Sequence, residues 1–328
     1  MGVEMKAKKR LIVIGGPTGT GKSIVAYELA LKIDGEVISA DSMQFYREIN
    51  IGTDKVPLWM REKVPHHFID FLSLSDDFDV YQFIKLATEK IDEISKRGRI
   101  PIVVGGSGLY LRALLKGVFH LPEGLKEKQI EIRDSLEREQ TETLYQQLQK
   151  VDPLLAKVLH PNDRKRIRRA VEVYLLTGKP ISLWQKERSS PITEDMDIYY
   201  YILTRKRDEM YNRIGQRVEK MFENGWVEEV KDLKAKGYAE YLKVKAPIGY
   251  KEILEYLEGR YNMDELKEVI KKKTRNLARR QLTWFRKEGG MWIEIEGEGE
   301  KCVEEIIKHL RGYYDTEVYK KRNGRDME

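Results

Sequence analysis

The sequence predicts an α/β protein in which helices cover both faces of a parallel sheet and an all-helical domain is inserted. Two observations predict the sheet. The apolar run Leu11–Ile14 leads through a glycine-rich loop into a helix over Ile24–Ile33, and further strand and helix patterns alternate after it. A third observation predicts the insertion, because only helical patterns occur between about residues 120 and 190. We expect a core of residues 1–119 and 191–312, an inserted helical domain of residues 120–190 and a polar, frayed tail of residues 313–328.

The loop between that strand and that helix fits the phosphate-loop pattern G-x-x-x-x-G-K-[ST]. It consists of Gly16, Pro17, Thr18, Gly19, Thr20, Gly21, Lys22 and Ser23, which we expect to bind a diphosphate or a longer phosphate chain. Glycines let backbone N–H groups turn toward phosphates, and the N-terminus of the following helix adds partial positive charge. Lys22 is expected to reach the terminal phosphate, and the Ser23 hydroxyl to ligate Mg²⁺. A glycine-rich turn without a ligand would leave the flanking strand and helix unexplained.

Length and composition allow a large core and exclude several classes of protein. The chain has 328 residues, of which 41% are hydrophobic and 35% are charged, and its net charge is +6. No apolar run is long enough to cross a membrane, and no signal peptide precedes the first strand. The single cysteine, Cys302, excludes a disulfide framework and a metal site built from several cysteines. We therefore expect a cytoplasmic protein without membrane contact, and a solvated surface alone would account for the net charge.

The second predicted strand, Glu36–Ala40, is followed by an acidic residue. Ligands of open α/β sheets lie beyond the carboxyl ends of the strands, which is where Asp41 falls. Asp41 is therefore either a carboxylate that holds Mg²⁺ or a general base aimed at a substrate above the phosphates. A third interpretation gives its side chain a local role, as the cap of the following turn.

The third predicted strand, Ile100–Val104, runs into a second glycine-rich loop, residues 105–108. Because βαβ crossovers bring the carboxyl ends of strands to one edge, we expect this loop beside the first. No acid follows the strand, whereas an ATPase needs a catalytic carboxylate or a water-positioning group at such a place. The small residues instead leave room for a bulky group above the phosphates.

The insertion contains a helix with a basic first turn. Asn162 or Asp163 caps the helix, and the basic residues that follow are Arg164, Lys165, Arg166, Arg168 and Arg169. Positive charge at a helix N-terminus is unfavourable by roughly a few tenths of a kcal/mol per residue. We therefore expect an anionic partner, with RNA as the leading candidate. A solvated charged face is the alternative.

Two helices after the insertion also carry patterned arginines. On the helix Arg207–Asn224, Arg213 and Arg217 lie one turn apart, a spacing that suits a diphosphate clamp. On the helix Met263–Lys287, an apolar face lies opposite a basic one. The apolar face comprises Leu266, Ile270, Leu277 and Trp284, and the basic face comprises Arg275, Arg279 and Arg286. Such a basic stripe suits the phosphodiester backbone of a nucleic acid.

Several motifs together resemble those of one enzyme family, the tRNA dimethylallyltransferases. Besides the phosphate loop they are Ser39–Gln44, Asn50–Thr53, Val64–His67, Val104–Tyr110, His160–Asp163, Ile248–Glu252, and Thr274–Arg275 with Arg279–Arg286. The resemblance runs from about residue 9 to residue 295. Enzymes of this family move an isopentenyl group from dimethylallyl diphosphate to an anticodon-loop adenosine, and their core is similar to that of P-loop nucleotide kinases.

The resemblance implies roles for three catalytic residues. Asp41 matches the family's general base, which removes a proton from the exocyclic amine of adenine. Thr18 matches the threonine that contacts both the diphosphate and the reacting centre, and Arg217 matches the arginine that grips pyrophosphate. Mg²⁺ is the implied cofactor, and the phosphate loop is implied to hold a leaving diphosphate instead of ATP.

The resemblance also implies that the partner is the anticodon stem-loop of a tRNA, and we expect the enzyme to be a monomer. Asp41, Ser42, Met43 and Gln44 would line the pocket of the extruded adenine. The further implied tRNA contacts are Ser107, Arg133, Lys165, Arg166, Ile167, Arg168, Arg169, Ile248, Gly249, Tyr250, Lys251, Arg279, Arg280, Gln281, Trp284 and Arg286, to which the basic stripe adds Arg275. Two positions depart from the family pattern: Ser107 replaces the usual threonine, and Pro247 stands where the family has no proline.

Other functions would also use a phosphate loop. A P-loop ATPase or kinase is disfavoured by the missing acid after Val104, and an adenylate isopentenyltransferase that acts on free nucleotide would not need the basic segment 165–169. An RNA-binding protein with a regulatory nucleotide site would have no reason to place Asp41 at a strand end. The sequence therefore favours transfer of a dimethylallyl group to tRNA.

Overall fold

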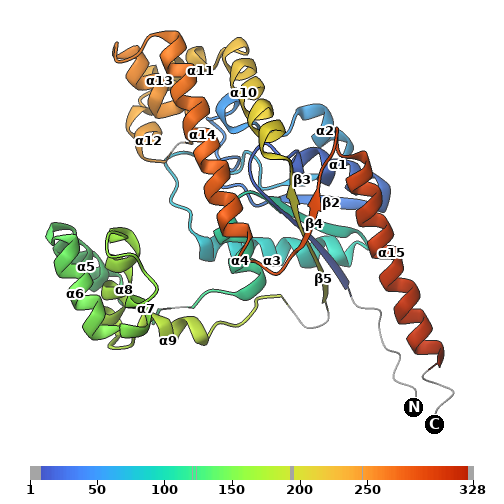
Figure 1. The fold of residues 1–328 in the computed structure, drawn as a ribbon, viewed down its shortest axis with the longest axis horizontal. Helices are drawn as coiled ribbons and strands as arrows, with labels where there is room; N and C mark the ends of the chain where they lie inside the picture. The colour runs from blue at the N-terminus through green and yellow to red at the C-terminus, as the bar shows by residue number, and fades with distance from the viewer. Residues whose placement is uncertain (1–8, 120, 123, 193–195, 246, 324–328) are drawn as a thin grey trace. The chain divides into compact units, whose positions relative to one another are not determined.

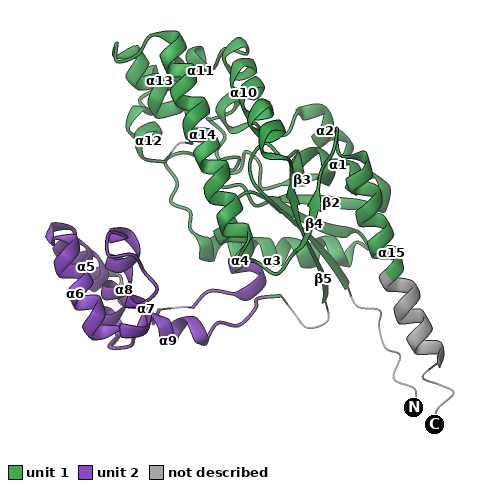
Figure 2. Ribbon diagram, viewed as in Figure 1, with its two compact units in different colours: residues 1–112, 192–328 green, residues 113–191 purple. Residues whose placement is uncertain are grey.

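The computed structural model describes the chain except for residues 1–8, 120, 123, 193–195, 246 and 324–328. It divides into two compact units (Figure 2). Unit 1 comprises residues 1–112 and 192–328, and unit 2 comprises residues 113–191. Unit 2 thus begins earlier than residue 120, the predicted start of the insertion, and it begins within helix α4 (Gly108–Lys116). No helix in the described part of the chain has both the length and the apolar composition that a membrane span needs.

Unit 1 is built on a parallel sheet (Figure 1). Its strands are β1 (Lys9–Gly15), β2 (Gly35–Ser39), β3 (His66–His67), β4 (Ile100–Gly105), β5 (Met196–Thr204) and β6 (Met291–Glu294). Their order is β3-β2-β4-β1-β5-β6, and every neighbouring pair is parallel. The predicted α/β fold is confirmed. The two glycine-rich loops are neighbours, as predicted, because Gly15 pairs with Gly105 where β1 and β4 end.

Helices cover both faces of this sheet. In β1, Ile12 and Ile14 belong to the core that includes α1 (Lys22–Ile33) and α15 (Glu300–Asn323). Leu11 and Val13 point to the opposite face and are also fully buried. Helix α3 (Val80–Lys96) contacts β1, β2 and β4. Continuous apolar strands such as Leu11–Ile14 are expected where both faces of a parallel sheet are covered.

Helix α15 extends to Asn323, beyond the point at which a frayed tail is predicted. The predicted tail begins at residue 313, but no glycine or proline lies between Gly312 and Gly324. Without such a residue the polar composition alone does not end a helix.

A second hydrophobic core joins the loop after β2 to the later helices of unit 1. These helices are α10 (Arg207–Glu223), α11 (Trp226–Ala235), α12 (Ala239–Val244), α13 (Tyr250–Leu257) and α14 (Met263–Phe285). The loop contributes the short helix η1 (Ile51–Thr53), and α2 (Leu58–Lys63) follows it. Trp226 is fully buried in this core. Its indole lies against Gly52 and Gly249, where a Cβ atom would come within 2.4 and 2.0 Å of the ring.

In its described residues, unit 2 contains only helices. They are α5 (Lys126–Arg138), α6 (Thr141–Val151), α7 (Pro153–Ala156), α8 (Arg164–Thr177) and α9 (Ile181–Lys186). Helix α8 is capped by Asp163, as predicted. Ile167, Ala170 and Val171 are buried in the core of the unit, whereas Leu175 is exposed.

The two ends of unit 2 lie side by side. Gly117 has a positive φ of 73°, and a Cβ atom on it would lie 1.8 Å from the carbonyl oxygen of Ser189. Only glycine permits both the backbone conformation and this approach. The chain therefore enters and leaves unit 2 at neighbouring points.

Candidate active site

A cavity of about 740 Å³ lies where the carboxyl ends of β1, β2 and β4 meet. Residues of the phosphate loop form one wall, and Asp41 and Gln44 come from the loop after β2. The remaining polar lining includes Asp54, Arg213, Arg217, Ser107 and Gln281. The sequence placed most of these residues near phosphates or RNA from separate patterns, and the fold brings them to a single cavity.

The phosphate loop has the backbone that its sequence predicts. Gly16, Gly19 and Gly21 all have positive φ values, and α1 begins directly after Gly21 at Lys22. A Cβ atom on Gly16 would lie 2.3 Å from the carbonyl oxygen of Leu203. The loop therefore requires glycine there for steric reasons as well as for its conformation.

Side-chain contacts close the loop on itself and tie it to α10. The Lys22 ammonium and the Thr20 hydroxyl both donate to the carbonyl of Pro17, at 2.7 and 2.9 Å. Arg217 donates to the Thr18 hydroxyl at 2.9 Å. The predicted diphosphate clamp, Arg217, is thus held at the phosphate loop, with its guanidinium facing the same cavity as Lys22.

Asp54 is a part of this cavity that the sequence analysis missed. Its carboxylate lies 3.1 Å from the Arg217 guanidinium, so Arg217 bridges Asp54 and Thr18. Asp54 follows η1 with a positive φ of 52°. Asp54 directly follows the motif Asn50–Thr53, and this position next to a family motif is the one feature of the sequence that could have indicated a role at the site.

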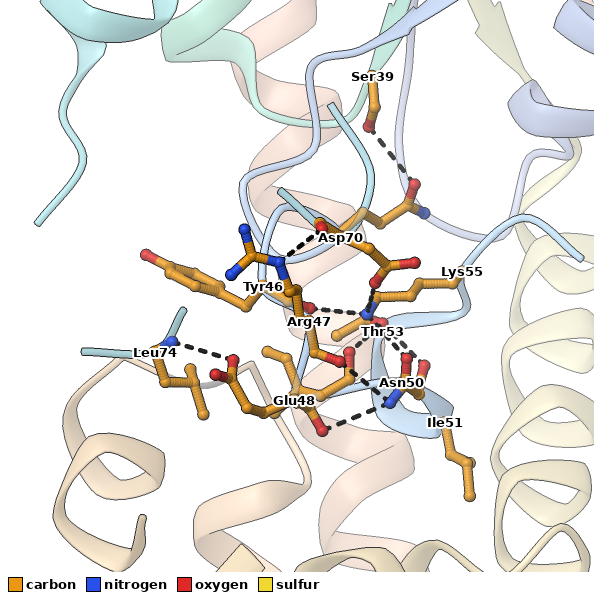
Figure 3. A network of polar contacts seen from close by, with 12 residues as sticks. Ser39, Tyr46, Arg47, Glu48, Asn50, Ile51, Thr53, Lys55, Asp70 and Leu74 are labelled. Atoms are coloured by element: carbon orange, nitrogen blue, oxygen red, sulfur yellow. Dashed lines mark hydrogen bonds and ion pairs between the residues drawn. The ribbon is translucent and has the colours of Figure 1, made fainter. Parts of the chain in front are cut away.

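A polar network holds the loop that carries Asp54 (Figure 3). The ammonium of Lys55 is surrounded by three acceptors: the carbonyl of Tyr46 at 2.7 Å, the side chain of Asn50 at 2.9 Å and the carboxylate of Asp70. Burial is the main cause that lowers the pKa of Lys55, and Asp70 opposes it. These contacts fix the backbone on both sides of η1, and they thereby fix Asp54 at the cavity.

Asp41 combines two of the interpretations that the sequence left open. One carboxylate oxygen accepts a hydrogen bond from the backbone N–H of Met43 at 3.1 Å, which is the local turn contact. The same side chain lines the cavity. Burial raises the pKa of Asp41, against the Met43 hydrogen bond and the positive charges of Lys22 and Arg217. A carboxylate whose basicity is raised inside a ligand cavity suits proton transfer.

The cavity has the donor set of a Mg²⁺ site that shares its metal with a phosphate ligand. Ser23, Asp41 and Asp54 supply one hydroxyl and two carboxylates to its wall. In the part of the chain that the structure describes, no cluster of three or more histidine, cysteine or acidic side chains is arranged for a metal. Mg²⁺ commonly takes only one or two protein ligands beside substrate phosphates and water. The residues present therefore fit this ion.

Burial in the cavity lowers the pKa of Lys22 to about 8, and the negative charge of Asp41 partly opposes this shift. We expect the affinity for inorganic pyrophosphate to fall as the pH rises through about 8, because Lys22 then loses the charge that attracts the ligand. Calorimetric titration between neutral and alkaline pH measures this change. The variant Lys22→Gln, which cannot titrate, is the matched control. A difference in affinity between the two proteins that does not shrink with rising pH would contradict the prediction.

Three of the four expected adenine-pocket residues, Asp41, Met43 and Gln44, line the cavity, and Ser42 is not among the residues that line it. Gln44 is buried. The Gln44 amide donates to the backbone carbonyl of Asp54 at 3.3 Å, and its oxygen lies 3.4 Å from the Ser39 hydroxyl. Ser42 is half-buried beside them.

Helix α14 is oriented differently from the prediction. Its fully buried side chains are Leu266, Ile270, Ala278 and Phe285, whereas Leu277 is only half-buried at the cavity wall. The predicted apolar face was therefore rotated by part of a turn. Arg279, Arg280 and Arg286 are exposed, and Arg275 is half-buried beside Glu268. The basic stripe is thus present on the surface of α14.

Two α14 residues that the resemblance implies as RNA contacts also make contacts inside the protein. Trp284 lies against Gly108, where a Cβ atom would come within 2.2 Å of the indole, and the guanidinium of Arg112 lies 4.1 Å from its ring centroid. Gln281 contacts Thr18 and Gly106 by hydrogen bonds. Trp284 lies on the apolar face of the predicted helix, so its inward packing agrees with that face, whereas the contacts of Gln281 were not predicted.

The segment around Tyr250 is largely structural. Tyr250 is fully buried, and its hydroxyl donates to Glu229 and accepts the N–H of Gly52 at 3.1 Å. Its side chain therefore cannot contact RNA as the resemblance implied. Pro247 and Ile248 line the cavity, Gly249 lies against Trp226, and Lys251 is exposed. Ala246 lies outside the described residues.

In unit 2, the basic turn of α8 has partners within the chain. Arg164 donates to the carbonyls of Glu137 and Glu139, at 2.7 and 2.6 Å, at the end of α5. Arg168 pairs with Glu137, and Arg166 pairs with Asp163. Lys165 is exposed. Acidic side chains and carbonyl groups of the protein therefore offset most of the positive charge at the N-terminus of α8. This weakens the argument that the basic turn requires an anionic ligand.

Two more of the expected RNA contacts share one buried carboxylate. Glu172 is almost fully buried and accepts from Arg133 at 3.0 Å and from Arg169 and Gln129 at 2.6 Å. Ile167, in contrast, is fully buried, so its side chain is unable to contact RNA. Ile167 lies inside a stretch that the resemblance implies as an RNA contact, but its side chain belongs to the core of unit 2.

Three features define a P-loop α/β protein. They are a phosphate loop at the end of β1, an arginine of α10 that contacts this loop, and a carboxylate after β2 in the same cavity. Comparison with known proteins identifies the family. The family model described as IPP transferase matches residues 44–288, and the chain belongs to this family.

Similar proteins cover nearly the whole chain. tRNA dimethylallyltransferase 1 of Citrifermentans bemidjiense is 44% identical over 94% of this chain and 99% of its own length. The tRNA dimethylallyltransferase of Thermotoga maritima is 39% identical over 92% of this chain and 97% of its own length. Among solved structures, the tRNA isopentenylpyrophosphate transferase of Bacillus halodurans has a TM-score of 0.68 at 35% identity and covers 96% of this chain and 100% of that one. A eukaryotic dimethylallyltransferase acting on tRNA has a TM-score of 0.72 at 34% identity and covers 87% of this chain and 74% of that one.

Proposed function

We propose that this protein transfers a dimethylallyl group from dimethylallyl diphosphate to the N6 amine of the adenosine 3′ to the anticodon in tRNA. The products are N6-isopentenyladenosine and diphosphate. The observation that carries the proposal is the cavity in which Asp41 lies beside Lys22, Arg217 and the phosphate loop. The activity in the names of the similar proteins supports the same reaction.

The donor side of the cavity would bind and stabilise the leaving diphosphate. Lys22, Arg217 and residues of the phosphate loop line the cavity, and they would surround the departing oxygen as it gains negative charge. Fixed donors in a partly desolvated site stabilise such charge better than water does. Mg²⁺, held by Ser23 with Asp41 or Asp54, would supply further positive charge to the diphosphate when bound. Apolar side chains of the cavity, among them Met43 and Met221, suit the dimethylallyl group.

On the acceptor side, Asp41 would act as the general base. The amine nitrogen of adenine bonds to C1 of the prenyl group, and the bond from C1 to the diphosphate oxygen breaks with its electron pair on oxygen. Asp41 accepts the proton that the amine loses. The adenine must leave its stack to reach the cavity, which costs a few kcal/mol and least in a single-stranded loop. The exposed Arg279 and Arg286 of α14 suit the phosphates of that loop.

Two features favour this function over its alternatives. β4 ends at Gly105 and is followed by Gly106 and Ser107, so it offers no carboxylate for ATP hydrolysis. A transferase for free nucleotides would have no use for exposed arginines along α14. We further propose a monomer and a cytoplasmic location, which suits a tRNA substrate.

The proposal is tested by incubating the protein with radiolabelled dimethylallyl diphosphate and total tRNA. We expect label in tRNA, release of pyrophosphate and no consumption of ATP. Inorganic pyrophosphate is expected to compete with the prenyl donor, because both bind the phosphate loop. RNA-stimulated ATP hydrolysis without prenyl transfer would favour an ATPase. Prenylation of free AMP as efficient as that of tRNA would favour an adenylate isopentenyltransferase.

A further inference from the structure

Gln281 points from α14 toward the phosphate loop. Its side-chain oxygen accepts a hydrogen bond from the backbone N–H of Thr18 at 2.9 Å. Its side-chain nitrogen donates to the backbone carbonyl of Gly106 at 3.0 Å. One side chain therefore joins α14 to the loops that follow β1 and β4.

These two contacts require a side-chain amide. The Thr18 N–H needs an acceptor and the Gly106 carbonyl needs a donor, and only one orientation of the Gln281 amide satisfies both. A carboxylate at this position would face the Gly106 carbonyl with a second acceptor. The space is also limited, because a Cβ atom on Gly106 would lie 2.7 Å from the Gln281 nitrogen.

Thr18 is consequently held at two points from two helices. Gln281 of α14 holds its backbone N–H, and Arg217 of α10 holds its hydroxyl at 2.9 Å. Arg217 is itself paired with Asp54 at 3.1 Å. The loop conformation around Thr18 thus depends on partners far away in the chain. In the described part of the chain, removal of Gln281 leaves Arg217 as the remaining side chain that hydrogen-bonds Thr18.

We propose that Gln281 is a positioning residue that fixes the phosphate loop for diphosphate binding. It acts through Thr18 and Gly106, and its effect on the donor site does not require RNA to be bound. The resemblance to the family implied a tRNA contact at this position, so the two assignments predict different defects. The proposal rests on the proposed function, because it assumes that the loop binds a diphosphate.

The variant Gln281→Ala removes both hydrogen bonds. We expect its Kd for inorganic pyrophosphate, measured calorimetrically with Mg²⁺ and without RNA, to rise about tenfold, since two partly buried hydrogen bonds are lost. Its Kd for an anticodon stem-loop, measured without donor, is expected to stay within about twofold of wild type. Thr283→Val is the matched control, because Thr283 is exposed on the same helix and, among the described residues, its hydroxyl has one hydrogen bond, to the carbonyl of Arg279. Its Kd for pyrophosphate should remain within about twofold of wild type.

A second variant displaces the amide without altering Gln281. Gly106 does not have a positive φ, so alanine is compatible with its backbone, but its methyl group would meet the Gln281 nitrogen. Gly106→Ala should weaken pyrophosphate binding in the wild-type background. It should add little in the Gln281→Ala background, because the amide is already gone. Thermal melting of all variants separates the loss of pyrophosphate binding from general destabilisation. General destabilisation would lower the melting temperature additively in the double variant.

The results distinguish this inference from the proposed function. Normal pyrophosphate binding by Gln281→Ala together with weaker stem-loop binding would overturn the inference and assign Gln281 to RNA. Fully additive losses in the two variants would also overturn it. Wild-type protein that binds no pyrophosphate would overturn the proposed function, and the inference with it.

Discussion

Replacement of Asp41 by asparagine is expected to slow single-turnover prenyl transfer by roughly 10²–10⁴-fold, the usual effect of losing a positioned general base. Asparagine keeps the shape of the side chain and its oxygen can still accept the N–H of Met43, so the turn should persist. Binding of pyrophosphate and of the stem-loop should therefore survive. Rapid-quench measurement with labelled donor and saturating tRNA reports the chemical step directly.

The pH profile provides an independent check on Asp41. Burial raises the pKa of this carboxyl above its ordinary value. A base must be ionised, so the wild-type rate should fall as the pH drops through that raised pKa, and the variant should lack this acidic limb. Asp54→Asn is the matched acid control, because it removes a carboxylate from the same cavity and should slow the chemical step less than Asp41→Asn. A wild-type rate in Asp41→Asn with weakened Mg²⁺ binding would favour the metal-ligand interpretation.

Replacement of Trp226 by alanine should cost about 3–5 kcal/mol in the free energy of unfolding. The indole is fully buried between Gly52 and Gly249 and lies edge-on to the Tyr250 ring, with centroids 5.7 Å apart. No side chain on either glycine is available to fill the resulting cavity. Urea unfolding followed by circular dichroism measures the loss without depending on tryptophan fluorescence.

Trp59 supplies the control for this prediction. It is half exposed on α2 and meets Tyr27 at a centroid distance of 5.5 Å. Trp59→Ala should cost less than about 1 kcal/mol, because surface substitutions rarely cost more. Equal losses in the two variants would show that the core around Trp226 does not stabilise the loop and the later helices.

The sequence allowed the centre of the site to be predicted because its signals are local. Strand, glycine-rich loop and helix follow one another without interruption, and the positive φ values of Gly16 and Gly21 are what those glycines imply. Asp41 was found because parallel strands end at one edge of a sheet. The same reasoning placed the loop after β4 beside the phosphate loop, as the pairing of Gly15 with Gly105 confirms.

Side-chain partners were the part that sequence patterns could not predict. A helical wheel gives the face of a residue but not its neighbour, so it placed Trp284 on the apolar face but could not predict the contacts of Gln281 with Thr18 and Gly106. The basic turn of α8 was interpreted without Glu137 and Glu172, which lie far from it in sequence or on its inner face. The sequence did not clearly predict the helices α11 to α13. They are short, and their arrangement depends on packing around Trp226.

The close approach of Gly117 to Ser189 has a consequence for chain entropy. β4 and β5 flank β1 in the sheet, although the whole of unit 2 separates them along the chain. A flexible segment of that length would raise the entropic cost of bringing the two strands together, by a term that grows with the logarithm of its length. Once unit 2 has folded with its ends adjacent, the entropic cost of bringing β4 and β5 to β1 is that of closing a short loop. The sheet can then assemble as if the insertion were only a turn, and a short linker in its place should leave the pairing of β1 with β4 and β5 intact.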